Sequence, residues 1–122
     1  MRIYIAARYD RREQMQGLLR AIEEIGHRVT SRWIRDSFAG VPDEICAGVD
    51  ESDIDEAEAL VAFSEPRGHL SHGGRHVEFG IALALNKRLF LVGDRENVFH
   101  HHPSVEQFKD VNHLLAFLRE NR

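Results

Sequence analysis

The stretch Ala59-Leu60-Val61-Ala62-Phe63 decides the fold of this chain. A short apolar run of this kind, bounded by polar residues, is typical of a β-strand that is buried on both faces. Similar runs occur at Ile3–Ala7 and Arg88–Val92. Strands without a polar face are typical of parallel sheets that helices cover on both sides. The three runs therefore predict strands of one parallel sheet.

The segments between these runs carry helical patterns or weaker strand patterns. Apolar residues recur at helical spacing over Asp10–Ile25, where Asp10 and Glu13 resemble a capping box and Gly26 stands where a helix C-terminal glycine belongs. Further helices are predicted over Asp43–Glu58, over Arg75–Asn86 and after the capping residue Asp110, and weaker strands over His27–Ile34 and Val105–Phe108.

This alternation of strands and helices predicts one domain over residues 1–122. The expected fold class is α/β: a flavodoxin-like (Rossmann-like) three-layer sandwich with a parallel sheet of about four to five strands and helices on both faces. In such sheets, ligands bind beside the carboxyl ends of the strands. The loops Ala7–Arg12, Ser64–Gly74 and Gly93–Pro103 are therefore the expected positions of a functional site.

Composition and motifs argue against several classes of function. The 122 residues include 16 Lys and Arg against 20 Asp and Glu, a net charge of −4, which does not favour binding to a nucleic-acid polymer. No apolar run approaches the roughly 20 residues of a membrane span. The single Cys46 favours a reducing, cytoplasmic location. The first strand is followed by no G-x-x-x-x-G-K-[ST] loop, which argues against an ATPase of that type. It is also followed by no G-x-G-x-x-G motif, which argues against a dinucleotide-binding fold.

Glu78 is the most informative residue of the sequence. In the helix predicted over Arg75–Asn86 it shares an apolar face with Ile81, and the other side of that helix is apolar as well. A helix that is apolar all round is typical of burial or of a subunit interface, so a carboxylate on it is unusual. The preceding Gly73-Gly74 turn would let a ligand approach the backbone. Glu78 is therefore either a functional carboxylate or an ordinary acidic residue of the first helical turn.

An acidic stretch precedes the strand at 59–63. Its members are Asp50, Glu51, Asp53, Asp55, Glu56 and Glu58. We expect most of them to form a solvated helix face, from which one carboxylate could reach the strand ends beside Glu78. Paired carboxylates suit the cleavage of a glycosidic bond, with one as nucleophile and the other as acid or hydroxyl binder.

Two clusters of basic residues lie near the expected site loops. They are Arg8, Arg11 and Arg12, and His69, His72 and His76. The arginines are either an anion site at a helix start or surface residues. The histidines have spacings that metal ligands can have, but most lie in a glycine-rich loop without a cysteine pair, so we expect no metal.

Three segments carry a resemblance to a known family. They are Tyr4-Ile5-Ala6-Ala7-Arg8-Tyr9, the stretch from Asp50 to Ala62, and Gly74-Arg75-His76-Val77-Glu78-Phe79-Gly80-Ile81-Ala82. The last is similar to a G-x-x-x-E-[LF]-G-x-A segment and contains Glu78. Together the segments resemble the nucleoside 2-deoxyribosyltransferases and the related deoxynucleoside monophosphate N-glycosidases. Arg8 departs from the pattern, because the monophosphate hydrolases have a serine and glycines in this region.

The resemblance implies roles for individual residues. Glu78 would be the nucleophile that attacks the anomeric carbon, Tyr4 would position its carboxylate, and Asp50 would contact the sugar hydroxyls or assist the leaving base. The implied substrate-binding residues are Ala7, Arg8, Tyr9, Gly74 and Asn97. The segment from Asn97 to His102 would lie where family members contribute to a neighbouring subunit's site. Neither a cofactor nor a metal is implied.

The resemblance also implies a reaction. The protein would cleave or transfer the N-glycosidic bond of (deoxy)nucleosides or their 5′-monophosphates through a covalent glycosyl-Glu78 intermediate. Water as the acceptor would make it a hydrolase, and a second base would make it a transferase. A non-catalytic nucleotide-sensing module of the same fold and an NAD glycohydrolase are the alternatives. We expect a small-molecule nucleoside or nucleotide as the partner, and a homodimer or higher homo-oligomer with shared sites.

Overall fold

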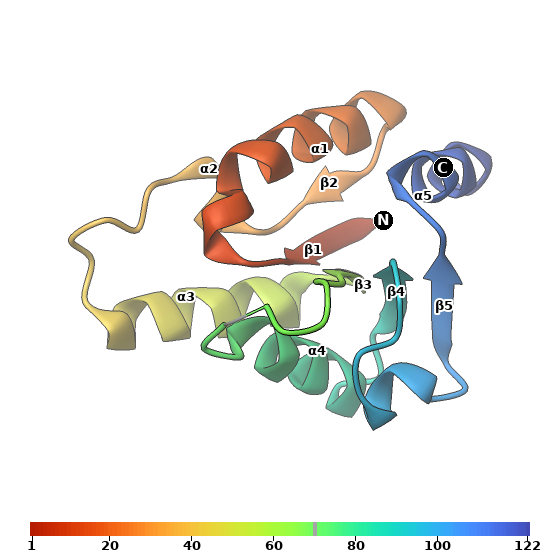
Figure 1. The fold of residues 1–122 in the computed structure, drawn as a ribbon. Coiled ribbons are helices and arrows are strands. Elements are labelled where there is room, and N and C mark those ends of the chain that lie inside the picture. The colour runs from red at the N-terminus through yellow and green to blue at the C-terminus, as the bar shows by residue number, and fades with distance from the viewer. Residues whose placement is uncertain (70) are drawn as a thin grey trace.

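Five parallel strands form the sheet at the centre of the structure (Figure 1). The computed structural model describes residues 1–69 and 71–122. The strands are β1 (Arg2–Ala6), β2 (Arg28–Val29), β3 (Ala59–Phe63), β4 (Arg88–Val92) and β5 (Val105–Phe108), in the spatial order β2-β1-β3-β4-β5. This is the strand order of flavodoxin-like sheets, so the predicted fold class is confirmed.

The three apolar runs of the sequence are the three inner strands. Tyr4 of β1 pairs with Leu60 of β3, which pairs in turn with Leu89 of β4, and none of these three residues has any exposed surface. The ranges predicted for β3, β4 and β5 agree with the structure. The inner strands are buried on both faces because helices lie above and below them.

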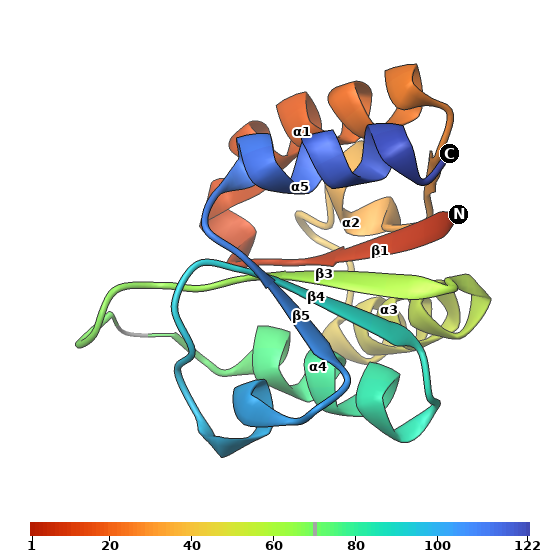
Figure 2. The same cartoon turned by 90° about the vertical axis from the view of Figure 1, so that its right-hand side faces the viewer.

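Helices cover both faces of the sheet (Figure 2). One face carries α1 (Arg12–Ile25) and α5 (Val111–Glu120), and the other carries α3 (Asp43–Glu56) and α4 (Gly74–Ala84). The connections contain the short helix α2 (Arg32–Arg35) and two 3-10 helices, η1 (Tyr9–Arg11) and η2 (Val98–His101). Within the described residues, no helix combines the length and the hydropathy that spanning a membrane requires.

The residues that the sequence predicts as helix ends mark real ends in two cases and fail in one. Gly26 ends α1 in the left-handed conformation, with φ of 113°, and the Asp110 side chain caps α5 by accepting from the His113 amide. The capping box at Asp10 does not form. Asp10 instead accepts from Arg8 Nη2 at 2.8 Å, the chain passes through η1, and α1 begins only at Arg12 without a side-chain cap.

The second strand is much shorter than the sequence predicts. Only Arg28–Val29 pairs with β1, whereas the prediction covered His27–Ile34. Beyond Val29, side chains satisfy the free edge of β1: Ser31 Oγ accepts from the Ile5 amide at 2.7 Å, and Trp33 Nε1 donates to the Ile5 carbonyl at 2.9 Å. Because these bonds replace a ladder of backbone bonds, the chain can turn away into α2 and still leave no unpaired group on β1 at Ile5.

Most members of the acidic stretch are exposed, as expected, and one, Asp53, is buried. Asp53 on α3 is 2% exposed and accepts from the backbone amide and the Nε of Arg32 at 2.9 and 2.8 Å. Its own carbonyl accepts from the Thr30 hydroxyl at 2.9 Å. Asp53 therefore ties α2 to α3, while Glu51, Asp55, Glu56 and Glu58 remain exposed.

Candidate active site

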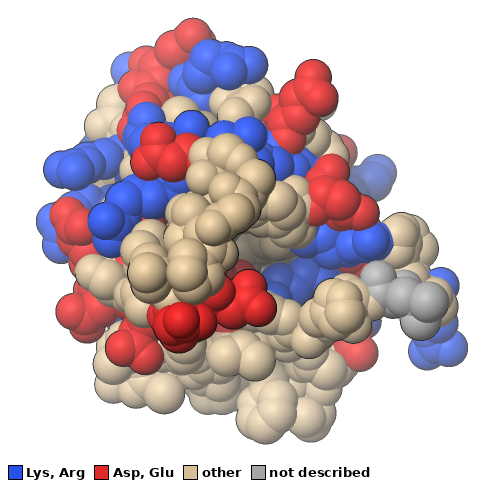
Figure 3. All heavy atoms as spheres, turned by 90° about the vertical axis from the view of Figure 1, so that its left-hand side faces the viewer, with Lys and Arg blue, Asp and Glu red and all other residues tan. Residues whose placement is uncertain are grey.

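A pocket of about 1000 Å³ lies beside the carboxyl ends of β1 and β3. The face of the molecule in Figure 3 has a hollow with acidic and basic side chains at its margin. The pocket is lined by Ala7, Arg8, Tyr9, Asp10, Trp33, Phe38, Ala47, Asp50, Glu51, Ile54, Ser71, His72, Gly73, Gly74, Arg75, Val77, Glu78 and Ile81. Two of the three predicted site loops, those after β1 and β3, contribute to this lining. The loop Gly93–Pro103 does not, and α3 and the segment around Phe38 take its place.

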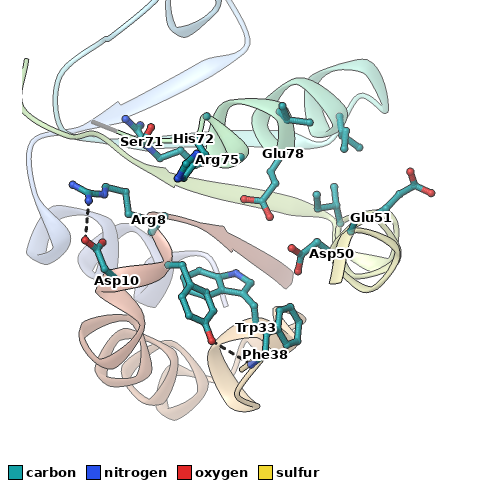
Figure 4. Close-up of a pocket in the computed structure, with 18 residues that line it drawn as sticks. Arg8, Asp10, Trp33, Phe38, Asp50, Glu51, Ser71, His72, Arg75 and Glu78 are labelled. Carbon is teal, nitrogen blue, oxygen red and sulfur yellow. Dashed lines mark hydrogen bonds and ion pairs between the residues drawn. The ribbon is translucent and has the colours of Figure 1, made fainter. Parts of the chain in front are cut away.

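Glu78 and Asp50 point toward one another across this pocket (Figure 4). Glu78 comes from α4 and Asp50 from α3, so the packing of these two helices sets the separation of the carboxylates. Glu78 is the fifth residue of α4, just past the first turn in which the sequence placed it. Its Oε2 accepts from the hydroxyl of Tyr4, which lies on β1 and has no exposed surface. The nucleophile candidate is thus held by a side chain from the centre of the sheet.

Asp50 has an unused hydrogen-bonding capacity. Its Oδ1 is buried and has no hydrogen-bond partner within the part of the chain that the structure describes. Leaving a buried carboxylate oxygen without a donor costs free energy. Since Asp50 lines the pocket next to Glu78, a small shift of its side chain would bring this oxygen to a ligand that supplies a hydroxyl or an N–H group.

The site raises the pKa of both carboxyl groups, so both ionise less readily than in water. Burial raises the pKa of Glu78 to about 8, the charge of Asp50 adds to this effect, and the hydrogen bond from Tyr4 opposes it. Burial, with the charge of Asp53, raises the pKa of Asp50 to about 6. Burial and the two neighbouring carboxylates also hold the pKa of Tyr4 far above its usual range, so its hydroxyl stays protonated. Pairs of perturbed carboxylates in a cleft are typical of catalytic sites.

One end of the pocket carries cationic and polar groups. Arg8 follows β1, and its guanidinium contacts both His69 and Asp10. The start of α4, with Gly73 and Gly74, faces the same end. A helix N-terminus beside an arginine suits an anionic group.

A second end of the pocket is aromatic. Trp33, Phe38 and Tyr9 line it, and the Tyr9 and Trp33 ring centroids are 6.0 Å apart. The sequence prediction did not include Trp33 or Phe38 in the site, because it placed Trp33 inside a strand. Ligands bind beside the carboxyl ends of parallel strands, and the residues that follow the second strand also lie at this edge of the sheet. With the correct, shorter strand, the same rule would have placed Trp33 and Phe38 in the site.

The structure brings most of the predicted site residues together. Ala7, Arg8, Tyr9, Asp50, Gly74 and Glu78 line the pocket. Tyr4 lies directly behind Glu78. Asn97 is outside this lining: its Oδ1 accepts from the Phe99 and His100 amides at 3.0 and 3.2 Å and caps η2. Its predicted role toward substrate could therefore be fulfilled only in a neighbouring subunit's pocket.

His69, His72 and His76 do not come together as a group of potential metal ligands among the described residues. His69 contacts Arg8, His72 lines the pocket, and only His76 belongs to a group of potential ligands among the described residues, with Glu96 and His100. This group does not suit a metal. His100 Nδ1 accepts from the Glu96 amide at 2.9 Å, which leaves the proton of the neutral ring on Nε2, and Arg75 already binds the Glu96 carboxylate through both terminal nitrogens.

Two solved structures share this fold over nearly the whole chain. A CMP N-glycosidase from Clostridium botulinum has a TM-score of 0.65 and 23% sequence identity, with 97% of this chain and 98% of that chain covered. A 2-deoxyribosyltransferase from the psychrotolerant bacterium Bacillus psychrosaccharolyticus has a TM-score of 0.73 and 19% identity, with 97% and 96% covered. No protein-family model matches the sequence, and no curated protein matches it significantly. At these identities the likeness establishes the fold, which is that of the enzymes the sequence resembles.

Proposed function

We propose, from a fold shared with an N-glycosidase and a 2-deoxyribosyltransferase, that this protein cleaves or transfers the N-glycosidic bond of nucleosides or their 5′-monophosphates. The observation that carries the proposal is the buried Glu78 carboxylate, held by Tyr4 and facing Asp50. The same pocket is lined by Arg8 and by the aromatic side chains of Tyr9, Trp33 and Phe38. A nucleotide has a group that suits each of these: a sugar for the carboxylates, a phosphate for the arginine and a base for the aromatic rings.

Glu78 is proposed as the nucleophile. Its carboxylate oxygen attacks the anomeric carbon, the C–N bond breaks, and the electron pair of that bond leaves with the base. The product is a glycosyl ester on Glu78. The acceptor, water or a second base, then attacks the same carbon from the opposite face and restores the carboxylate, so the configuration is retained. The hydroxyl of Tyr4 orients Glu78 for the first step.

Asp50 is proposed to act on the sugar hydroxyls or on the leaving base. With pKa values of about 6 for Asp50 and about 8 for Glu78, the pair holds about one proton at pH 7. When that proton is on Asp50, Glu78 is ionised and can attack while Asp50 protonates the departing nitrogen. When the proton is on Glu78, Asp50 is ionised and can accept from a sugar hydroxyl, and Glu78 must release its proton before it attacks. Substrate charge and geometry determine which of these roles dominates.

A panel of substrates tests the proposed reaction. Nucleosides, their 5′-monophosphates and NAD are incubated with the purified protein, with and without a second free base, and the products are identified by liquid chromatography and mass spectrometry. Free base indicates hydrolysis, and an exchanged nucleoside indicates transfer. Nicotinamide release from NAD alone would replace the proposal with an NAD glycohydrolase. Binding of nucleotides without any product would favour a sensing module instead.

Arg8 is predicted to recognise a 5′-phosphate. Arg8→Ala should lower kcat/KM for monophosphates by roughly ten- to hundredfold, because a charge-assisted hydrogen bond to the phosphate is lost. The same variant should change kcat/KM for the corresponding nucleosides little. Arg67→Ala removes an exposed arginine that does not line the pocket, and it serves as the control. An equal loss on monophosphates and nucleosides would refute the phosphate contact.

The protein is further proposed to act as a homo-oligomer. Large apolar side chains are exposed on α4, at its C-terminal cap and on η2: Val77 (64%), Leu85 (45%), Val98 (74%) and Phe99 (60%). Val77 also lines the pocket, so a second subunit on this surface would border the site. In sedimentation velocity, we expect a dimer or larger species for the wild type and a monomer for the double variant Val98→Ser/Phe99→Ser. Ile45→Ser, an exposed apolar position on α3, is the control, and a wild-type monomer at all concentrations would contradict the proposal.

A further inference from the structure

The hydroxyl of Tyr9 holds the backbone of the segment that covers the aromatic end of the pocket. The Phe38 amide donates to this hydroxyl at 3.2 Å, a contact that Figure 4 shows as a dashed line. Tyr9 lies in η1, directly after β1, whereas Phe38 lies between α2 and α3. The bond therefore joins two walls of the pocket that are 29 residues apart in the chain.

Few other bonds hold the Phe38 segment in place. Among the described residues, hydrogen bonds join residues 37–41 to other elements only at Tyr9 and at Cys46, whose Sγ is 3.8 Å from the Val41 carbonyl. The remaining bonds of this segment are internal, from the Ala39 amide to Ser37 Oγ and from the Val41 amide to the Phe38 carbonyl. The Phe38 side chain is half-buried and packs against the core, and the Tyr9 hydroxyl fixes the backbone that carries it across the pocket.

We infer that Tyr9 is a positioning residue through which the pocket selects ligands by their ring: its hydroxyl fixes Phe38, and Phe38 with Trp33 and Tyr9 binds a flat aromatic heterocycle. The inference rests on the proposed function only in taking this heterocycle to be the base of a nucleotide. Aromatic side chains bind flat rings by stacking or edge contacts, and such contacts need rings that are held in place. Among the described residues, no hydrogen bond or ion pair joins Phe38 to Arg8 or Asp10, so we expect groups bound at the charged end to depend little on this bond.

The bond is tested first without any ligand. Tyr9→Phe keeps the ring and removes only the hydroxyl, so we expect hydrogen exchange at the Phe38 amide to become at least about threefold faster when measured by NMR. Ser37→Ala is the matched control, because it removes one hydroxyl hydrogen bond of the same segment that does not involve Tyr9. Exchange at Phe38 that is equally fast in the wild type and in Tyr9→Phe overturns the inference.

Ligand selection is tested by binding in the Glu78→Gln background, in which the proposed reaction is blocked. Trp33 is the only tryptophan of the sequence and lines the pocket, so its fluorescence reports occupancy. The probes are the four ribonucleoside 5′-monophosphates and ribose 5-phosphate, which has no base. Tyr9→Phe should raise the Kd of at least one nucleotide by about three- to tenfold, the effect of one hydrogen bond. The Kd of ribose 5-phosphate, measured by calorimetry, should not change.

A double-mutant cycle shows whether Tyr9 acts through Phe38. If it does, Tyr9→Phe has no further effect on nucleotide binding once Phe38→Leu is present. Additive effects of the two substitutions, or an equal loss for ribose 5-phosphate, overturn the inference. Nucleotides that do not bind the Glu78→Gln protein also overturn it, whatever the cleavage assay gives. Ring-selective binding without cleavage by the wild type leaves the inference standing and refutes the proposed function.

Discussion

Replacing Glu78 by Gln is expected to reduce turnover by at least about 10²-fold while the fold is kept, as the loss of a covalent catalyst should. The amide is nearly the same size as the carboxylate, and its oxygen can still accept from the Tyr4 hydroxyl. It does not form the glycosyl ester, because a neutral amide is a far weaker nucleophile than a carboxylate. The measurement is kcat on the best substrate of the panel, with circular dichroism as the check on folding.

Mass spectrometry sharpens this test. Brief incubation of the wild type with substrate should add the mass of the glycosyl group to the intact protein, and peptide mapping should place it on Glu78. Glu24→Gln removes an exposed carboxylate on α1 and should behave as the wild type does. Unchanged turnover in Glu78→Gln would reject its catalytic role. An adduct on another residue would move the nucleophile elsewhere.

The same substitution should stabilise the protein at alkaline pH. The pKa of Glu78 is about 8 in the folded protein, against an ordinary value of 4.5. Between these two values the unfolded chain has released the proton that the folded protein retains, so the free energy of unfolding falls as the pH rises from about 4.5 to about 8. Glutamine does not titrate. We therefore expect Glu78→Gln to be more stable than the wild type by roughly 3 kcal/mol at pH 9 and similar to it at pH 4.5.

Urea denaturation at the two pH values measures this difference. Glu24→Gln, at a solvent-exposed position, should follow the pH dependence of the wild type. A variant that is less stable than the wild type at pH 9 would show that the carboxylate serves the fold. Loss of activity together with a gain in stability identifies a group whose burial is maintained for function.

The fold could be predicted well where neighbouring residues in the sequence decide the structure. The inner strands are short apolar runs, and Gly26 and Asp110 mark helix ends by local chemistry. The second strand could not be predicted because its end depends on contacts from distant parts of the chain. Trp33 and Ser31 bond to Ile5, more than 20 residues earlier in the chain, and periodicity within the segment carries no information about these bonds.

Prediction of the site from the sequence is limited in the same way by contacts between distant parts of the chain. Glu78 could be found because a carboxylate on an apolar helix is conspicuous, and the family resemblance added Tyr4 and Asp50. Helical periodicity and residue type alone could not distinguish Asp50 from Asp53, three residues away on the same helix. One faces the pocket with an unpartnered oxygen, and the other is buried against Arg32. Only the packing of α3 against its neighbours separates a candidate catalytic carboxylate from a structural one.

The position of β1 inside the sheet has a consequence for folding during synthesis. β1 is translated well before its longer pairing partner β3, which lies more than 50 residues later in the chain. The partner of Tyr4 in the site, Glu78, follows 74 residues after it. The edge of β1 that pairs with β3 therefore stays unpaired while the ribosome synthesises roughly half of the domain. At about 5–20 residues per second this interval lasts several seconds, during which the nascent strand can bind chaperones or aggregate.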